Sequence, residues 1–403
     1  MLKLALRNVL RHKLRAGMTL AAIIFGVVGL VISGGFVQDV YFKLGEALIH
    51  SQSGHLQIHR AGFHGKGARN PEKFLIEETD SVKQTLRTRP EIDDAMARIS
   101  FSGLLNNGRN DWAVVGEGVE PDKEARLGSF VSFTAGRQLT DNDAYGVVVG
   151  FGVAQALKLK PGDDVTLLAN ALEGAQNTVE LKVIGVFQSF STDYDARAVK
   201  IRLPSAHELL GTNGVNAVVV SLKKTSDTDQ VAVLLTDQLR FRSLEVKTWV
   251  ELNDFYEKTV QLYQRQFGFL LVIVLIMVVL SVANSVYMNV FERVGEFGTM
   301  MSLGNRRSQI FRLILTESVL LGLIGSGLGL ALGVLLAFAI SAMGIPMPPP
   351  PNSNLGYRAE IQIVPMALLT SFSIGLAATI LASLLPAVRV SRTPVVEALR
   401  SNV

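Results

Sequence analysis

The sequence contains no cysteine, and only 18% of its 403 residues are charged and 7% are aromatic. The absence of cysteine excludes disulfide scaffolds, cysteine-ligated zinc, iron–sulfur clusters and thiol nucleophiles. Soluble domains average roughly 25% charged residues, so the low charge content disfavours an ordinary cytosolic protein. Glycine, in contrast, occurs 36 times. Abundant glycine with few aromatic residues favours close packing of helices in lipid.

Motifs for catalysis are also missing from the sequence. No phosphate-binding G-x-x-x-x-G-K-[ST] loop occurs, because the Gly65-Lys66 pair lacks the flanking residues. Neither the G-x-S-x-G nucleophile motif nor the H-E-x-x-H zinc motif is present. We therefore expect neither an enzyme nor a cofactor site in this chain. If ATP and Mg²⁺ are used, we expect a separate ATPase subunit to bind them.

Four uncharged apolar stretches are long enough to cross a bilayer, which takes about 20 helical residues. They lie at residues 16–36, 267–291, 319–343 and 361–388. Soluble core helices rarely stay uncharged over such a length, so we predict transmembrane helices at 16–36, 266–291, 313–343 and 361–388. The first stretch lacks a small-residue cleavage pattern, and we expect an uncleaved signal anchor there.

Basic residues gather in the three short segments that four membrane crossings place on one side. They are Lys3, Arg7, Arg11, Lys13, Arg15, Arg293, Arg306, Arg307, Arg312, Arg389, Arg392 and Arg400, against the acids Glu292, Glu296, Glu317 and Glu397. In residues 37–265, acidic residues outnumber basic ones. The positive-inside rule therefore predicts that both termini are cytoplasmic and that residues 37–265 lie outside. Because the positive charge faces the membrane, we do not expect a nucleic-acid partner.

Residues 37–265 are long enough for an extracytoplasmic domain, and their patterns mix strands with helices. Helical patterns at both of its membrane junctions predict stalk helices. The fold class that follows is a membrane domain of four helices with an extracytoplasmic α+β domain, including a β-rich subdomain inserted at about 130–205. The predicted strands are 54–59, 97–105, 111–119, 165–168, 179–187 and 199–203, and the predicted helices are 79–89 and 227–240.

The remaining segments flank the membrane spans. Residues 1–15 form either an amphipathic helix on an anionic leaflet or a basic flank that only sets the topology. Residues 292–312 are predicted to be a cytoplasmic loop and residues 389–403 a cytoplasmic tail. The outer loop at 344–360 contains GIPMPPPP, a stiff polyproline stretch that either connects two spans or contacts a lipid or lipoprotein.

Small residues recur every four positions in the third and fourth spans. Such ridges let helix backbones approach closely, which favours packing where no hydrophobic force acts. The sequence leaves open whether the ridges pack within one chain or between two subunits. The ridges are Gly325, Gly329, Gly333, Ala337 and Ser341; Ser318, Gly322 and Ser326; and Ser371, Gly375, Thr379 and Ser383.

A histidine cluster at His50, His55, His59 and His64 has a spacing that metal ligands can show. In a strand, His55 and His59 would share one face while Leu56 lies on the other. A polar strand face explains the spacing more simply, and no metal site is predicted.

Three acidic residues are expected to have structural rather than catalytic roles. Asp193 and Asp195 flank Tyr194 in a predicted loop and are expected to be solvated. Glu317 lies at the cytoplasmic edge of the third span, where we expect an arginine partner rather than proton transfer. The apolar stretches themselves carry no Asp, Glu, Lys or Arg, which disfavours an ion-coupled secondary transporter.

Four parts of the sequence resemble one family of membrane proteins. FERVGEFGTMMSLGNRRSQI at residues 291–310 resembles the cytoplasmic loop of FtsX-like permeases of the MacB and LolC/LolE type. LALRNVLRHKLR at 4–15 and PAVR at 386–389, with PVVEALR at 394–400, are similar to the family's two termini. SGHLQIH at 53–59 resembles the first outer strand of the LolC/LolE-like branch. The middle of the outer domain matches in pattern more than in residues.

The resemblance implies a bacterial inner-membrane ABC transporter permease that forms a dimer with a second copy or a homologous permease. A separate ATPase would contact a coupling helix in the loop. Glu292 and Glu296 are expected on one helical face, with Gly304 ending the helix and Asn305 capping the next. The residues assigned to coupling are Glu292, Arg293, Glu296, Phe297, Met300, Gly304 and Arg306.

Three functions remain open at this point. The first is an ABC transporter that extracts or exports a lipoprotein, lipid or other amphiphile from the outer leaflet by mechanotransmission. The second is an FtsX-type signalling complex that activates a periplasmic or cell-wall enzyme, and the third is a membrane scaffold without an ATPase. For the first, acyl chains would lie where the first two spans leave the lipid, against Val27, Leu30, Phe36, Phe267, Leu270 and Leu271.

Overall fold

A computed structural model describes residues 13–67, 74–171, 174–349 and 356–394. Most of the predicted N-terminal helix at 1–15 and of the tail at 389–403 lies outside the described residues. The chain divides into two compact units. The membrane unit comprises Met1–Tyr41, Thr259–Pro346 and Arg358–Val403, and the outer unit comprises Phe42–Lys258 and Met347–Tyr357.

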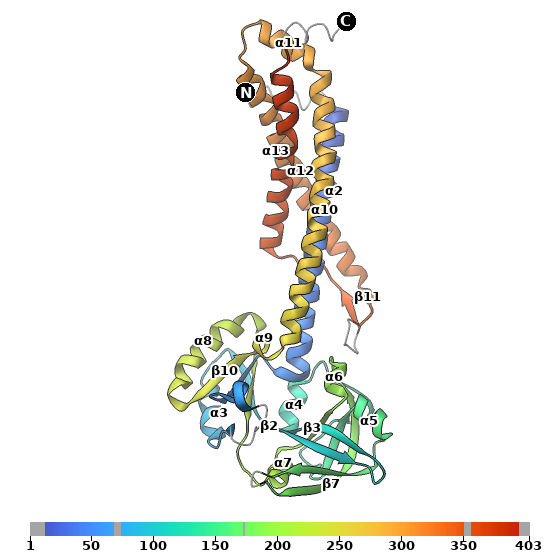
Figure 1. The fold of residues 1–403 in the computed structure, drawn as a ribbon, viewed down its shortest axis with the longest axis vertical. Helices are drawn as coiled ribbons and strands as arrows, with labels where there is room; N and C mark the ends of the chain where they lie inside the picture. The colour runs from blue at the N-terminus through green and yellow to red at the C-terminus, as the bar shows by residue number, and fades with distance from the viewer. Residues whose placement is uncertain (1–12, 68–73, 172–173, 350–355, 395–403) are drawn as a thin grey trace. The chain divides into compact units, whose positions relative to one another are not determined.

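Four long helices contain the apolar stretches, except for residues 361–364, which precede the fourth helix, and each is long and apolar enough to cross a membrane. This confirms the predicted four-helix membrane domain. α2 and α10 lie side by side (Figure 1), and the Tyr41 hydroxyl of α2 donates a hydrogen bond to the Val260 carbonyl at 3.4 Å. Both helices continue beyond their apolar stretches without a break. The helices are α2 (Lys13–Leu48), α10 (Asp254–Glu292), α12 (Arg307–Met343) and α13 (Pro365–Ser391).

The membrane unit has an apolar core near the end that carries the short helix α11 (Val294–Ser302). Valines at 282, 286 and 290 of α10 are buried there, at helical spacing, against residues of α12 and α13. Farther along α10 the packing is sparse. Only 11% of its most apolar window is buried, against 33 to 39% in the other three helices, so most of α10 is left to lipid or to another chain.

The outer unit is built on one mixed sheet of ten strands. Nine strands follow the order β10-β1-β9-β2-β3-β8-β5-β7-β4, and β6 pairs with β2 and β7. The strands are β1 (Leu56–Arg60), β2 (Ile92–Asn106), β3 (Asp111–Val119), β4 (Ser132–Gly136), β5 (Gly146–Gly150), β6 (Asp164–Asn170), β7 (Gln176–Gln188), β8 (Ala198–Arg202), β9 (Ala217–Leu222) and β10 (Leu244–Thr248). A separate two-stranded sheet pairs β11 (Ile345–Met347) with β12 (Tyr357–Ala359).

Short helices connect these strands and cover the sheet (Figure 1). They are η1 (Ile49–Ser53), η2 (Phe63–Gly67), α3 (Thr79–Arg87), α4 (Pro121–Leu127), α5 (Phe151–Leu157), α6 (Thr192–Asp195), α7 (Leu203–Leu210), η4 (Thr225–Asp227), α8 (Thr228–Leu239), η5 (Arg240–Arg242) and α9 (Trp249–Leu252). Together with the sheet they form the large α/β domain that the sequence pattern indicated.

The predicted hairpin joins β2 and β3 through an antiparallel ladder that ends at the pair Asn106 and Asp111. Amide oxygens of Asn106 and Asn107 accept backbone N–H groups of the turn, which is how asparagine stabilises turns. The β-rich segment predicted at 130–205 contains β4 to β8. These strands share the large sheet with the rest of the unit, because β8 pairs with β3 and β6 pairs with β2.

One polar residue that we expected at the surface is buried. Asp195 is 1% exposed, and both of its carboxylate oxygens lie 3.0 Å from the Ser189 N–H. The prediction of a solvated side chain is therefore wrong for Asp195, since its carboxylate holds together the connection between β7 and α6. Asp193, two residues earlier, is exposed as predicted.

The histidines of β1 and its start are also internal. His55 and His59 are 1% and 3% exposed. His59 Nδ1 donates to the Asn216 carbonyl at 2.7 Å, and His55 Nδ1 accepts the Leu222 N–H at 3.1 Å. The polar face of β1 is thus paired with protein groups rather than with water. Among the described residues, no three histidine, aspartate or glutamate side chains are grouped as metal ligands.

We predict that acid destabilises the outer unit through these histidines. Burial lowers the pKa of His55 and of His59 from 6.5 to about 4. The unfolded chain therefore gains protons first as the pH falls from about 6.5 towards 4, and stability present above that window is lost, on the order of 3 kcal/mol per histidine. His59→Gln should reduce this pH dependence of the free energy of unfolding.

Urea unfolding of the full chain in detergent, followed by tryptophan fluorescence, measures the effect because both tryptophans, Trp112 and Trp249, lie in the outer unit. Gln155→Asn is the control for substitution as such, because Gln155 is exposed on α5 and does not titrate. Equal pH dependence in the His59 variant and the parent protein would show that His59 does not supply the effect.

Candidate functional site

A short amphipathic helix, α11, joins α10 to α12 in the predicted coupling loop. Glu292 is the last residue of α10 and Glu296 belongs to α11. The prediction that the two carboxylates share one helical face is therefore wrong. The helix is interrupted at Arg293, whose backbone (φ −103°, ψ 9°) leaves the helical region and whose side chain turns inward.

Arg293 is held in the membrane unit by a forked ion pair with Glu317 of α12. Its Nη1 lies 2.8 Å and its Nη2 3.4 Å from the two carboxylate oxygens. Its Nε also lies 3.0 Å from Glu296, and its guanidinium stacks on Phe297 at 5.0 Å from the ring centre. Bidentate pairs of this kind fix orientation as well as charge. Glu317 thus has the arginine partner expected for it, and the pair sets the start of α11.

The end of α11 is set by Gly304. Its backbone is left-handed (φ +96°), which glycine adopts without strain. The N–H groups of Gly304 and Asn305 bond to the carbonyls of Met301 and Met300, each at 3.1 Å, which is a Schellman ending. Asn305 therefore closes α11 and does not cap α12, contrary to the prediction.

The cap of α12 is formed one residue later. The Arg306 N–H donates to Gln309 Oε1 at 2.8 Å, and the Gln309 N–H donates to the Arg306 carbonyl at 2.8 Å. Together the two ends make the loop a compact, well-defined projection at this end of the membrane unit.

Only part of the predicted coupling set lies on the surface of this projection. Arg293 and Phe297 are buried at 4% and 1% exposure, and Met300 is half-buried. Arg293 and Phe297 therefore position α11 instead of offering a contact. The exposed residues are Glu292, Glu296, Gly304 and Arg306, together with Thr299, Ser302 and Leu303, which the sequence did not single out.

A second feature of the membrane unit is a cavity of about 460 Å³ between α2, α10 and α13. It lies towards the ends of α2 and α10 at which their apolar stretches give way to the stalk segments. None of the described residues that line it is charged. The lining residues are Gly29, Leu30, Ser33, Gly34, Val37, Gln38, Tyr41, Gln264, Phe267, Gly268, Leu270, Leu271, Val274, Val364, Met366, Ala367, Thr370, Ser371 and Ile374.

Four of the six residues predicted to contact an amphiphile line this cavity, namely Leu30, Phe267, Leu270 and Leu271. Phe36 is half-buried outside the lining, and Val27 is 1% exposed within the helix bundle. The prediction is wrong for Val27, because this side chain packs against the glycines of neighbouring helices.

The small-residue ridge of α12 faces α2 of the same chain. A Cβ atom on Gly325 would lie 2.9 Å from Ile23, and one on Gly329 would lie 2.8 Å from Val27. On Gly333 it would lie 3.0 Å from Val31. Cβ atoms rarely or never approach other atoms so closely, so glycine at these positions permits the helix contact. Of the two alternatives left open by the sequence, these residues pack within one chain.

The ridge of α13 completes the same packing. A Cβ on Gly375 would collide with Val27 of α2 and would lie 2.7 Å from Ser326 Oγ of α12. Thr379 and Ser383 on this ridge are fully buried. Three helices are therefore bound closely to one another through small residues.

Four membrane-spanning helices, a capped loop and a large mixed α/β unit define an integral membrane protein with a domain outside the bilayer. A family model described as the MacB-like periplasmic core domain matches residues 16–238, more than half of the chain, and one described as the FtsX-like permease C-terminal domain matches residues 268–395. The chain belongs to the FtsX-like ABC transporter permeases of the MacB and LolC/LolE type.

Curated relatives are similar over most of the chain. A macrolide export ATP-binding/permease protein, MacB of Rhodopseudomonas palustris, is 26% identical over 345 residues, which cover 81% of this chain and 50% of that protein. The lipoprotein-releasing system transmembrane protein LolE of Haemophilus influenzae is 23% identical over 313 residues, 75% of this chain and 71% of that protein. The chain spans about half the length of the MacB relatives that it matches.

A solved structure also matches part of the chain. The periplasmic region of MacB from Actinobacillus actinomycetemcomitans aligns with a TM-score of 0.37 and 16% identity, over 53% of this chain and 94% of that one.

We predict that Gly329→Val destabilises the membrane unit, because the added side chain would meet Val27 and the backbone of Ile24. Overpacking of this kind costs about 1–3 kcal/mol or more. Gly327→Val is the matched control on the same helix, since a Cβ there meets nothing within 4 Å. Thermal unfolding in detergent should separate the two variants. If both unfold at the parent temperature, the contact between α12 and α2 is not tight.

Proposed function

We propose that this permease couples ATP hydrolysis by a separate ABC ATPase to movement of its outer unit, and that it acts on a lipoprotein, lipid or other amphiphile in the outer leaflet of the bacterial inner membrane. The observation that carries the proposal is the uncharged cavity between α2, α10 and α13. Its volume of about 460 Å³ is within the range of small-ligand sites.

The chemistry of the lining favours an amphiphile. Leu30, Phe267, Leu270 and Leu271 offer apolar surface, while Gln38 and Gln264 offer amide groups near the stalk. An acyl chain already in the bilayer gains little by moving between apolar surfaces, because burial of a CH₂ group is favourable only relative to water. Selective binding must therefore come from polar groups at the end of the cavity and from the outer unit holding the headgroup or attached protein.

The absence of charged side chains in the spans disfavours a hydrophilic path across the bilayer. Among the described residues of the four apolar stretches, no acidic or basic side chain lies midway across the bilayer. A hydrophilic substrate would need such groups along its path. Movement at the outer face, driven from the cytoplasmic side, needs none.

The proposal also includes the orientation of the chain in the membrane and its partner proteins. The excess of Lys and Arg in the short segments supports cytoplasmic termini and a cytoplasmic α11, with the outer unit in the periplasm. The ATPase would hold ATP and Mg²⁺ and contact the exposed side of α11. A second copy, or a homologous permease, would cover part of α10, which is the least buried of the four long helices.

The relatives' names favour transport over signalling. The LolE relative is named for lipoprotein release and the MacB relative for macrolide export. A signalling complex would need a docking site for an enzyme on the outer unit, and no observation on the described residues identifies one. Transport of an amphiphile is therefore the function we propose.

We predict that Leu303→Asp weakens association with the ATPase, and that Glu296→Lys does so both at the surface and by placing a cation beside Arg293. Leu303 is 80% exposed at the end of α11, so its replacement leaves the fold intact. Creating like-charge or desolvated contacts at an interface costs on the order of several kcal/mol. The measurement is the amount of ATP-hydrolysing subunit that copurifies, with the ATPase rate of the complex. Phe241→Asp, at a residue 94% exposed in the outer unit, is the control; equal copurification by all variants would place the contact elsewhere.

We predict that Gly34→Phe removes bound amphiphile. Gly34 lines the cavity and a Cβ there meets nothing within 4 Å, so the ring would occupy cavity space. Gly17→Phe is the matched control on α2, where a Cβ also meets nothing. Both complexes are purified in mild detergent without nucleotide, and their bound lipids and lipoproteins are analysed by mass spectrometry. Undiminished binding in Gly34→Phe would exclude this cavity as the site.

A further inference from the structure

The outer end of the α2 stalk has an unusual backbone. The α-helix changes at Leu48 into η1, a π-helical turn over Ile49–Ser53, and ends at Gly54 with φ +66°. A π-helical turn is wider than an α-helical one and leaves backbone carbonyls outside the regular pattern. We call Ile49–Ser53 the stalk root. Carbonyl groups at such a helix end need donors from elsewhere.

Several polar side-chain contacts connect the stalk root to the domain around it. Gln57 of β1 donates from Nε2 to the Ser53 carbonyl at 2.8 Å. Arg98 of β2 donates from Nη1 to the Gln52 carbonyl at 2.5 Å. His50 of the stalk root lies with Nδ1 3.3 Å from the Leu127 carbonyl, at the end of α4, and with Nε2 3.3 Å from Glu46 of α2. Because both ring nitrogens face acceptors, the charged imidazolium satisfies both contacts.

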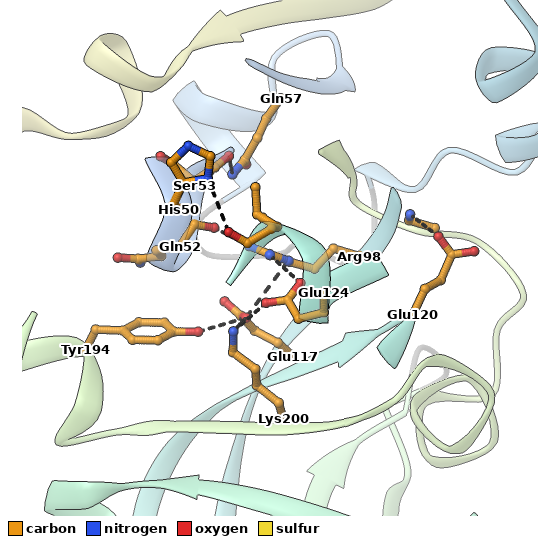
Figure 2. A network of polar contacts seen from close by, with 12 residues as sticks. His50, Gln52, Ser53, Gln57, Arg98, Glu117, Glu120, Glu124, Tyr194 and Lys200 are labelled. Carbon is orange, nitrogen blue, oxygen red and sulfur yellow. Dashed lines mark hydrogen bonds and ion pairs between the residues drawn. The ribbon is translucent and has the colours of Figure 1, made fainter. Parts of the chain in front are cut away.

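Arg98 is the centre of a buried charged network that Figure 2 shows. Its Nη2 lies 2.8 Å from Glu124 Oε2 of α4, and Lys200 Nζ of β8 lies 2.5 Å from the other oxygen of Glu124. The Tyr194 hydroxyl of α6 donates to Glu117 of β3 at 2.8 Å. Glu117 also lies 3.9 Å from both Arg98 and Lys200. Two cations and two carboxylates are thus balanced within the domain.

The four charges are 3 to 7% exposed. Removing such groups from water is costly, and replacing a buried pair with apolar side chains often leaves stability unchanged or higher. Stability alone therefore does not account for the network. The network also connects three elements. The Arg98 guanidinium contacts both the stalk root and Glu124 of α4, and Glu124 contacts Lys200 of β8.

We propose that Arg98 is a positioning residue that makes the stalk root and α4 move as one body, so that displacement of α2 reaches the outer unit through Glu124 and Lys200. The inference rests on the proposed function, in which the ATPase moves the stalk. His50 adds a second, parallel connection to α4 through the Leu127 carbonyl.

The test uses the double variant Arg98→Met/Glu124→Met. It removes one cation and one carboxylate, so Lys200 and Glu117 remain as a balanced pair 3.9 Å apart. Apolar replacement of a buried ion pair often leaves stability unchanged or higher. The donor to the Gln52 carbonyl is lost. Thermal unfolding checks that the variant is folded. Arg126→Met is the matched control, because Arg126 lies on α4 like Glu124 but forms a surface pair with Asp94.

The distance between two spin labels, one on α2 and one on α4, tests this connection in the full chain, which has no native cysteine. Cysteines replace Phe42 on α2 and Ala125 on α4, both of which are exposed. We expect a narrow distance distribution in the parent protein and in Arg126→Met, and loss of the narrow distribution in the double variant. A distribution that stays narrow in the double variant would overturn the proposal.

Hydrogen exchange in the assembled ATPase complex supplies the functional readout. We expect ATP to change exchange in α4 and β8 of the parent complex, and this response to be lost in the double variant while ATP hydrolysis continues. An unchanged response in the double variant would also overturn the proposal. If ATP changes exchange nowhere in the parent complex, the proposed coupling function fails, whereas the label distances without nucleotide still decide whether Arg98 joins the stalk root to α4.

Discussion

Close contact at the glycines of α12 and α13 is the interaction on which the membrane unit depends. Lipid provides no hydrophobic force to bring helices together, so their association relies on how closely the backbones approach. Gly325, Gly329 and Gly333 of α12 admit the side chains of Ile23, Val27 and Val31 from α2. α10 joins this packing at Gly26 of α2, where a Cβ would collide with Val278, but it is the least buried of the four long helices, and the cavity lies along it.

The placement of charge follows from the same solvent constraint. Ionisable side chains are costly in lipid and are tolerated at its edge when paired. Glu317 meets this condition through Arg293, and the pair also sets where α11 begins. In the outer unit the buried charges are paired too, through Arg98, Glu117, Glu124 and Lys200. Both networks fix the geometry of a helix end, one at the loop and one at the stalk root.

Each step of the proposed mechanism can be assigned to one of these structural features. The exposed side of α11 offers a contact for an ATPase, α2 is continuous to Leu48, and Arg98 holds the turn that follows. The cavity between α2, α10 and α13 offers apolar surface beside polar amides. Movement of a helix that both lines the cavity and ends in the stalk root would change the two sites together.

The sequence by itself determined the features that depend on local pattern. Uncharged length defines the four spans, the Asn-Asn-Gly turn defines the hairpin of β2 and β3, and Gly304 marks the end of α11. Only the tertiary structure decided which chain the glycine ridges contact, that Asp195 is buried, and that Asn305 closes one helix without capping the next. Charged residues within apolar strands, such as Arg98 and Lys200, are the sequence signal that indicates buried ion pairs. Their partners could not be predicted, because Arg98 meets Gln52 and Glu124 across 46 and 26 residues of chain, and only the folded backbone brings such groups together.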